Sequence, residues 1–256
     1  MKFINEKTIN IFTDASVKQM QNGTYISVPG YIISVIDLNY KTNGCDILFN
    51  STNNEGEITA ILLGLTKLLE IKRELNLNLN DYTINVFSDS LICVKSLREW
   101  IFKWSNKMHN GIMYNSNNTP VLNQDIIKYI IDLIVTNNIN VNFYHIKGHS
   151  ENMSLDKIRD IFHQNNNILI DFESINIIRN ENILIDKITR SIFTLYSDIE
   201  LRDRQTYCIN NIMKNIIIPI ISKEYINCFY KNIINWKDVF LMEIMKKRNS
   251  LIRWYR

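Results

Sequence analysis

Cysteine is sparse in this chain, and its four residues, Cys45, Cys93, Cys208 and Cys228, form no C-x-x-C pair. Such wide spacing argues against a structural zinc site and against a framework of disulfide bonds. The sequence therefore predicts reduced cysteines buried in a core, and a cytoplasmic location. Apolar runs are short as well: none approaches the roughly 18 uninterrupted residues that a membrane span needs, so we expect no membrane partner.

Neither sign of charge is in large excess. A formal net charge of +3 over 256 residues permits a local basic patch, but by itself it does not predict nucleic-acid binding. Hydrophobic residues make up 46% of the chain and aromatic residues 11%, which excludes wholesale disorder. No internal repeat is apparent, and the length fits one large domain or a core of typical size with an appendage.

The order of elements predicted from hydrophobic periodicity is that of an α/β fold. Five runs have strand character: residues 9–14, 31–36, 45–49, 82–89 and 141–146. Helical spacing predicts helices from Glu57 onward, over 91–104 and over 123–135. The first three strands follow one another through short connections, which favours an antiparallel meander. We therefore expect a mixed five-stranded sheet with flanking helices.

Three acidic residues lie at the ends of these elements. Asp14 ends the first predicted strand, Asp89 ends the fourth, and Glu57 opens the helix between them. If the two strands are parallel neighbours, both aspartates emerge at one edge of the sheet. Ala60 and Gly64 share a helix face with Glu57, so this helix can lie close against the sheet. Crowded carboxylates repel one another unless divalent cations neutralise them, and sites with only oxygen ligands suit Mg²⁺ or Mn²⁺.

Six segments around these acids resemble type 1 ribonuclease H, the family that cleaves the RNA strand of RNA/DNA hybrids. They read FTDAS (12–16), STNNEGEITAI (51–61), FSDSLICVKSLREWIFKW (87–104), TPVLNQD (119–125), HIKGHS (145–150) and NILIDKITR (182–190). The resemblance covers roughly residues 8–195 and implies the ribonuclease H-like fold, which agrees with the periodicity. It divides the chain into a catalytic domain over 1–195 and a helical C-terminal extension over 196–256.

The resemblance also implies roles for the acidic residues. Asp14, Glu57 and Asp89 match three of the family's four metal-binding carboxylates, and His149 matches its loop histidine, expected to manage protons or product release. Two divalent ions about 4 Å apart would activate a water and stabilise the departing 3′-oxygen. The expected cofactor is Mg²⁺, with Mn²⁺ as a substitute, and the expected products carry 5′-phosphate and 3′-hydroxyl ends.

The fourth carboxylate of the family follows the fifth strand in an N-x-x-x-D context. Asp186 fits this context, with Asn182 four residues before it. Asp156 is the competing choice, and Asp160 and Asp171 are weaker ones. Choosing Asp186 implies an insertion over about residues 151–181, whose helical character suggests a structured lid.

Contacts to an RNA/DNA hybrid can be carried over from the family in the same way. The matching residues are Ser16 and Asn53 for RNA 2′-hydroxyls, Thr52 and Asn123 for a phosphate of the DNA strand, and Trp104, with Trp100, beside a basic handle. Each also has a structural explanation, since Asn123 suits a helix N-cap and the tryptophans suit a core-facing pair. Both explanations stay open here.

Several positions depart from the family pattern. The handle holds only Lys107 and His109 after the second tryptophan, which predicts a weaker electrostatic grip. Glu55 stands where an arginine is common, and Leu91 replaces a polar reader of the 2′-hydroxyl. Hybrid affinity would then have to come from other parts of the chain.

The C-terminal extension is one candidate source of that affinity. Its last eleven residues carry five basic side chains and no acid: Lys246, Lys247, Arg248, Arg253 and Arg256. Trp254 and Tyr255 are interleaved with them, which suits contact with a nucleic-acid backbone. A solvated helix end explains the same pattern, because cations are favourable at a helix C-terminus.

Two other functions fit parts of the pattern. A resolvase or exonuclease on the same fold is one, although the first strand lacks the D-x-E of the common exonuclease pattern. A catalytically silent hybrid-binding module of a replication complex is the other. Intact carboxylates argue against such a module, because an unused cluster of repelling acids brings no structural benefit.

Overall fold

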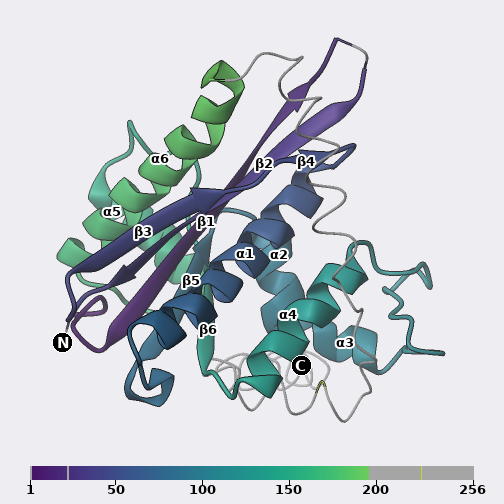
Figure 1. Cartoon of the computed structure of the whole chain (residues 1–256), viewed down its shortest axis with the longest axis horizontal. Coiled ribbons are helices and arrows are strands. Elements are labelled where there is room, and N and C mark those ends of the chain that lie inside the picture. The colour runs from purple at the N-terminus through teal and green to yellow at the C-terminus, as the bar shows by residue number, and fades with distance from the viewer. Residues whose placement is uncertain (1, 22, 196–225, 227–256) are drawn as a thin grey trace, which may run out of the picture.

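A mixed β-sheet forms the centre of the computed structural model, which describes residues 2–21, 23–195 and 226 (Figure 1). Five strands run in the order β3-β2-β1-β5-β6. Their bounds are β1 Thr8–Gln19, β2 Tyr25–Val35, β3 Tyr40–Cys45, β5 Thr83–Ser88 and β6 Val141–His145. A sixth short strand, β4 (Leu48–Phe49), pairs with β2. The predicted meander and mixed sheet are confirmed, because β1, β2 and β3 pair antiparallel whereas β1, β5 and β6 pair parallel.

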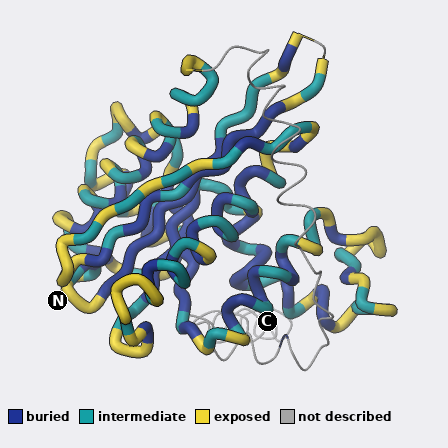
Figure 2. Tube along the Cα trace, viewed as in Figure 1, coloured by how far each residue is buried: buried dark blue, intermediate teal, exposed yellow. Residues whose placement is uncertain are grey.

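Helices cover both faces of the sheet (Figure 1). The elements of one side are α1 Asn53–Glu74, α2 Leu91–Lys95, a π-helical turn η2 Ser96–Trp100, α3 Ile101–Ser105 and α4 Gln124–Thr136, with a 3₁₀ turn η1 at Leu79–Asp81. The other side carries α5 Leu155–Asn166 and α6 Phe172–Leu195. Figure 2 shows buried residues along the central strands and on the helix faces turned towards them.

Alternation along β1 explains the two core layers. Ile9 and Ile11 are fully buried in the cluster formed with α1 and α4, whereas Phe12 is buried in the cluster formed with α5 and α6. Helix α1 approaches the sheet closely at Gly64, where an added Cβ would lie 2.6 Å from Ile11 Cγ2. This confirms the close-packing face predicted for α1.

The predicted third strand is wrong in its position. β3 begins at Tyr40, inside a polar stretch predicted as a connection. Of the predicted strand, Cys45 is the last residue of β3, and Leu48 and Phe49 form β4. β3 is an edge strand whose exposed residues, such as Lys41 and Asn43, alternate with partly buried ones. An edge strand with a solvated face needs few apolar residues, so periodicity underestimates it.

Other boundaries also differ from prediction. Asp14 does not end its strand: β1 continues to Gln19, paired with β2. Helix α1 begins four residues before Glu57, with Thr52 as its N-cap. The helix predicted over 91–104 is interrupted by η2, a wider turn that hydrophobic spacing does not reveal.

The segment between β6 and α6 contains a helix, as predicted. Helix α5 buries Ile158 and Phe162 in the core beside α6 and β6, so it forms part of a packed layer. Whether α5 acts as a structured lid stays a prediction. Whether the segment is an insertion relative to the family stays a prediction.

The cysteine prediction holds only in part. Cys93 is buried, but Cys45 is exposed at the end of the edge strand β3, and both are free thiols. Of the predicted extension over 196–256, the structure describes Ile226. Cys208 and Cys228 therefore lie outside the described residues. Ile226 itself is fully buried in the core cluster of α1 and α4.

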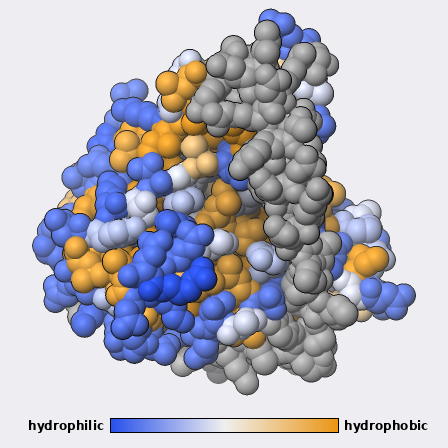
Figure 3. Space-filling model, viewed as in Figure 1, coloured by the Kyte–Doolittle hydropathy of each residue, from blue (hydrophilic) through white to orange (hydrophobic). Residues whose placement is uncertain are grey.

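Hydrophilic and hydrophobic residues are interspersed on the described surface seen in Figure 3. Over residues 2–21, 23–195 and 226, no helix combines the length and the apolar character needed to cross a membrane.

Candidate active site

Asp14, Glu57 and Asp89 converge at the point where β1 and β5 separate. The last parallel pair between these strands is Thr13 with Ser88, so each aspartate is the residue that follows this pair. Glu57 comes from the first turns of α1, and one ligand oxygen of each of the three acids lies within 4.8 Å of the others. The predicted meeting of the three carboxylates is confirmed.

These acids line a cleft of about 600 Å³. Its other lining residues include Ser16, Asn53, His149, Asp186 and Arg190. His149 is exposed in the loop after β6 and has a left-handed backbone with φ of 50°. Gly148, the residue before it, packs so closely on Asp89 that an added Cβ would lie 2.3 Å from Oδ2 of that carboxylate.

Burial and mutual repulsion shift the protonation of the three carboxylates. Asp14 is 5% exposed, and its burial, followed by the charges of Asp89 and Asp186, raises its pKa to about 7. The pKa of Glu57 is raised well above its ordinary value by burial and then by Asp89 and Asp14. Burial also raises the pKa of Asp89, while a positive charge on His149 would lower it.

One oxygen of this cluster lacks a partner. Among the described residues, no group donates a hydrogen bond to the buried Oε2 of Glu57. Buried polar oxygens are normally paired, so an orphan beside two more carboxylates suits a hard divalent cation that would supply the missing contact. The donor set, oxygen only and partly desolvated, fits Mg²⁺ or Mn²⁺.

Helix α6 adds a fourth acid to the cleft. Asp186 lines the cleft on α6, forms an ion pair with Arg190 at 2.7 Å, and contributes to the raised pKa of Asp14. Thr189, fully buried on the same helix, donates a hydrogen bond to Oδ2 of Asp14 at 3.3 Å. The N-x-x-x-D spacing therefore singled out an aspartate that the fold brings to the other three.

The competing aspartates lie elsewhere. The side chain of Asp156 is 71% exposed and faces Arg159 at 3.5 Å on α5. Asp171 accepts hydrogen bonds from Phe3 N and Ser174 N at the start of α6, and Asp160 is exposed on α5. None of these three lines the acidic cleft.

Two cleft neighbours were missed by sequence reasoning. Glu151 lies beside His149 and Asp186, with ligand atoms of all three within 4.8 Å of one another. Thr189 also escaped notice, although it follows Asp186 by three residues and therefore shares its helix face. Both residues could have been found from the sequence, because each lies within three positions of a predicted site residue.

A second, larger hollow of about 1010 Å³ lies between the start of α1, the helical segment α2–η2–α3 and the loop before α4. It brings together Thr52, Trp104 and Asn123, whereas Ser16 and Asn53 line the acidic cleft. The predicted substrate contacts therefore divide between two hollows. Thr52 and Asn53 are adjacent at the start of α1 and line different hollows.

The structural roles predicted for these residues, helix capping and ring packing, are seen for some of them and not for others. Thr52 caps α1, because its hydroxyl accepts a hydrogen bond from Glu55 N at 3.2 Å. Asn123 occupies the N-cap position of α4 with a left-handed φ of 54°, but its side chain makes no capping hydrogen bond. Trp104 is buried with its ring 6.0 Å from that of Trp100, and both rings line the larger hollow.

The larger hollow has few basic groups on its walls. Lys103 and Lys107 are its lysines, and Lys107 Nζ donates within its own loop to Asn118 Oδ1 at 3.2 Å. Glu55 adds a negative charge, and the apolar side chains of Ile92 and Leu122 are 49% and 83% exposed at this hollow. The weak basic character predicted for this region fits the charges seen along the wall.

Comparison with known proteins matches the sequence of this chain to a family. The sequence profile of the RNase H family matches residues 6–167. Ribonuclease H of Thermoanaerobacter sp. (strain X514) is 35% identical over 104 residues, which cover 40% of this chain and 57% of the relative. Ribonuclease H of Tropheryma whipplei (strain Twist) is 27% identical over 150 residues, which cover 57% of this chain and 83% of the relative. The chain thus spans little more than half the length of the first of these relatives.

Solved structures in the same family are more distant. The RNase H domain of PFV has a TM-score of 0.45 at 18% identity and covers 63% of this chain and 93% of its own. LC11-RNase H1, isolated from compost, has a TM-score of 0.41 at 17% identity and covers 62% of this chain and 97% of its own. Because the family profile matches more than half of its length, the chain belongs to the RNase H family.

Proposed function

We propose that this protein is an endoribonuclease that hydrolyses the RNA strand of RNA/DNA hybrids. The observation that supports this most is the convergence of Asp14, Glu57, Asp89 and Asp186 on one cleft in a member of the RNase H family. Its curated relatives carry the name ribonuclease H. Each acid alone has an ordinary structural role, but four acids at one cleft with an unpartnered buried oxygen favour a metal-dependent hydrolase.

The four carboxylates would hold Mg²⁺, with Mn²⁺ as a substitute. When bound, divalent cations of this kind lower the pKa of a ligand water and stabilise charge that develops on phosphate oxygens. Asp14 would hold the cations together with Glu57 and Asp89 on one side and Asp186 on the other, and the charges of Asp89 and Asp186 both act on it. His149, which lines the cleft and is exposed, would move a proton or help the product leave, and the proposed products carry 5′-phosphate and 3′-hydroxyl ends.

The two hollows suit the two strands of a hybrid. Ser16 and Asn53 lie beside the acids, where an RNA strand would present its 2′-hydroxyl groups. Thr52, Asn123 and Trp104 lie in the larger hollow, where the DNA strand would run. The start of α1 separates these hollows, so one duplex could place a strand on each side of Asn53.

A catalytically silent hybrid-binding module is the second candidate. It is favoured by the mixed charge of the larger hollow, where Lys107 bonds within its own loop and Glu55 faces the same space. The raised pKa values of Asp14 and Glu57 favour catalysis instead, since buried, repelling acids are costly unless they are used.

The experiment uses the full chain with Mg²⁺ and three labelled substrates: an RNA/DNA hybrid, duplex DNA and duplex RNA. Cleavage confined to the RNA strand of the hybrid is expected, and the Asp14→Asn variant, purified in parallel, should be inactive. Cleavage of duplex DNA would favour a resolvase or exonuclease instead. Binding of the hybrid without cleavage would favour the silent module.

A further inference from the structure

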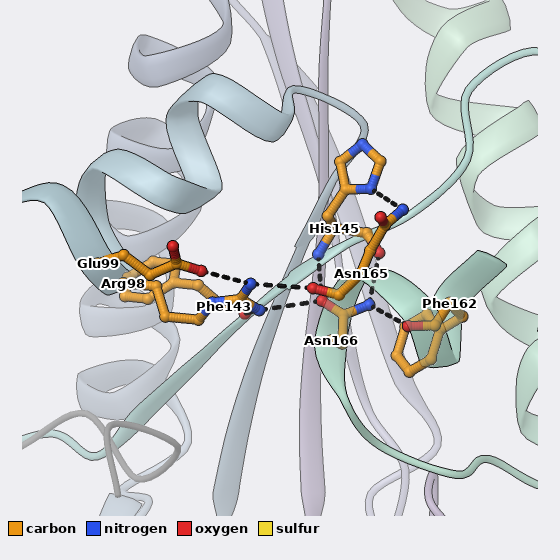
Figure 4. A network of polar contacts seen from close by, with 7 residues as sticks. All are labelled: Arg98, Glu99, Phe143, His145, Phe162, Asn165 and Asn166. Atoms are coloured by element: carbon orange, nitrogen blue, oxygen red, sulfur yellow. Dashed lines mark hydrogen bonds and ion pairs between the residues drawn. The ribbon is translucent and has the colours of Figure 1, made fainter. Parts of the chain in front are cut away.

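A buried polar network joins the π-helical turn η2 to α5 and β6 (Figure 4). Arg98, 4% exposed in the π-helical turn η2, is at one end. Its guanidinium donates to Phe143 O at 3.4 Å, Asn166 Oδ1 at 3.1 Å and Asn165 O at 3.0 Å, and pairs with Glu99 at 3.1 Å. A buried arginine with this many partners is fixed in position, and it fixes the end of α5.

Asn166 connects this end of α5 to the edge of the sheet. Its Oδ1 accepts from His145 N at 2.8 Å, and its Nδ2 donates to His145 O at 2.7 Å and to Phe162 O at 2.9 Å. β6 is an edge strand, so the outward backbone groups of its last residue have no neighbouring strand. The side-chain amide of Asn166 takes the place of that strand at His145.

The side-chain amide of Asn165 contacts a nitrogen of the His145 ring, as Figure 4 shows. Asn165 Nδ2 lies 2.8 Å from His145 Nδ1, and an amide nitrogen can only donate, so Nδ1 is the acceptor. The ring proton is therefore on Nε2, which donates to the backbone oxygen of Asp89 at 3.0 Å. Burial lowers the pKa of His145 to about 4, which is consistent with a neutral ring.

Asp89 needs such a contact because the sheet ends just before it. Its strand makes the last parallel pair at Ser88, so the backbone oxygen of Asp89 lies beyond the regular ladder. We propose that His145 is a positioning residue that fixes the backbone of Asp89, and through it the carboxylate that binds the divalent cation. Arg98, Asn165 and Asn166 hold His145 in turn. This inference rests on the proposed function, since it assigns Asp89 to the metal site.

Two substitutions at one position test the role of the ring. His145→Leu removes the donor to Asp89, whereas the side-chain amide of His145→Gln can donate to the same oxygen. Binding of Mg²⁺ by calorimetry and of Mn²⁺ by electron paramagnetic resonance is measured on the full chain without substrate. We expect His145→Leu to weaken binding about tenfold or more, the range for groups that orient metal ligands, and His145→Gln to stay within about threefold of wild type.

Asn142→Ala is the matched control. Asn142 lies three residues earlier on β6, is 4% exposed, and donates to Asn85 away from the cleft. We expect this variant to lower the unfolding temperature while metal affinity stays unchanged. Equal weakening by Asn142→Ala and His145→Leu would show a general loosening of the sheet and overturn the inference.

The remaining outcomes separate the inference from the proposed function. Unchanged metal affinity in His145→Leu, or failure of His145→Gln to restore it, overturns the positioning role while the function stands. Absence of metal binding by the wild-type protein overturns the proposed function, and with it the role of Asp89 that His145 serves. Weakened binding in His145→Leu with recovery in His145→Gln supports the inference, whichever nucleic acid is cleaved.

Discussion

The hydroxyl group of Thr189 lies 3.3 Å from Oδ2 of Asp14 and 2.8 Å from the hydroxyl of Ser16. Thr189 is on α6 and the other two residues are on β1, so this contact ties the fourth acid's helix to the strand that carries the first acid. One turn earlier, α6 places Asp186 at the same cleft. Residues more than 170 positions apart thus share one hydrogen-bonded centre.

Removing this hydroxyl should change metal binding at neutral pH. The hydrogen bond from Thr189 lowers the pKa of Asp14, which burial otherwise raises to about 7. Thr189→Val keeps the shape and loses the donor, so Asp14 should hold its proton to higher pH and Mg²⁺ should bind about fivefold more weakly at pH 7. Calorimetry between pH 6 and pH 9 measures this shift. Thr189→Ser is the matched control, and an identical pH profile in wild type and Thr189→Val would contradict the expectation.

The charge on Asp14 should destabilise the protein when no divalent ion is present. Its pKa in the folded state is about 7, above the ordinary value of 3.8, so stability falls as pH rises between these values. In EDTA at pH 8, Asp14→Asn should therefore raise the free energy of unfolding by about 2 kcal/mol or more. The gain should shrink as pH falls towards 4, where Asp14 is neutral in the folded state.

Urea unfolding at both pH values measures this effect. Asp156→Asn removes an equal charge from an exposed site and should change stability little. Equal stability of wild type and Asp14→Asn at pH 8 would show that Asp14 carries no penalty.

The fourth carboxylate can be identified by two asparagine substitutions. Asp186→Asn should reduce hybrid cleavage by more than about 100-fold, because groups that only orient metal ligands already contribute up to that factor. Asp156→Asn should leave cleavage unchanged, since its exposed side chain lies outside the acidic cleft. We would compare the initial cleavage rates of both variants with wild type at saturating Mg²⁺. Their unfolding temperatures check that both variants fold. The opposite pattern would reassign the fourth ligand to Asp156.

The salt dependence of hybrid binding should show whether the basic C-terminal residues contact the nucleic acid. If they contact the nucleic-acid backbone, replacing Lys246, Lys247 and Arg248 by alanine should weaken hybrid binding. The slope of log affinity against log salt should also become shallower by about 0.7–0.9 for each phosphate that the protein no longer neutralises. Fluorescence anisotropy at several salt concentrations measures the slope.

A control variant replaces three basic residues that line neither hollow: Lys7, Lys72 and Arg73. It changes the net charge equally and should keep the wild-type slope. Identical slopes in all three proteins would favour the solvated helix end for the C-terminal residues.

The sequence predicted the centre of the site because its residues sit next to strong local patterns. Asp14 and Asp89 follow apolar runs with clear alternation, and Glu57 precedes a clear helical period. Asp186 was identified by spacing from Asn182 and by the family resemblance. These four positions needed no knowledge of distant contacts.

Other features depend on partners far along the chain. β3 was misplaced because an edge strand exposes Lys41 and Asn43 and lacks an apolar period. The π-helical turn at Arg98 has ordinary helical spacing, and its partners Asn165 and Asn166 lie 67 and 68 positions away. Only the folded arrangement joins such residues, so no local pattern could have predicted them.

The claim on which the function depends is that the acidic cleft binds divalent cations through Asp14, Glu57, Asp89 and Asp186. Anomalous diffraction from crystals of the full chain soaked in Mn²⁺ tests it most directly. The predicted result is anomalous density within bonding distance of Asp14 and at least two of the other three carboxylates. Crystals that show Mn²⁺ bound elsewhere, with no density between these side chains, would contradict the claim.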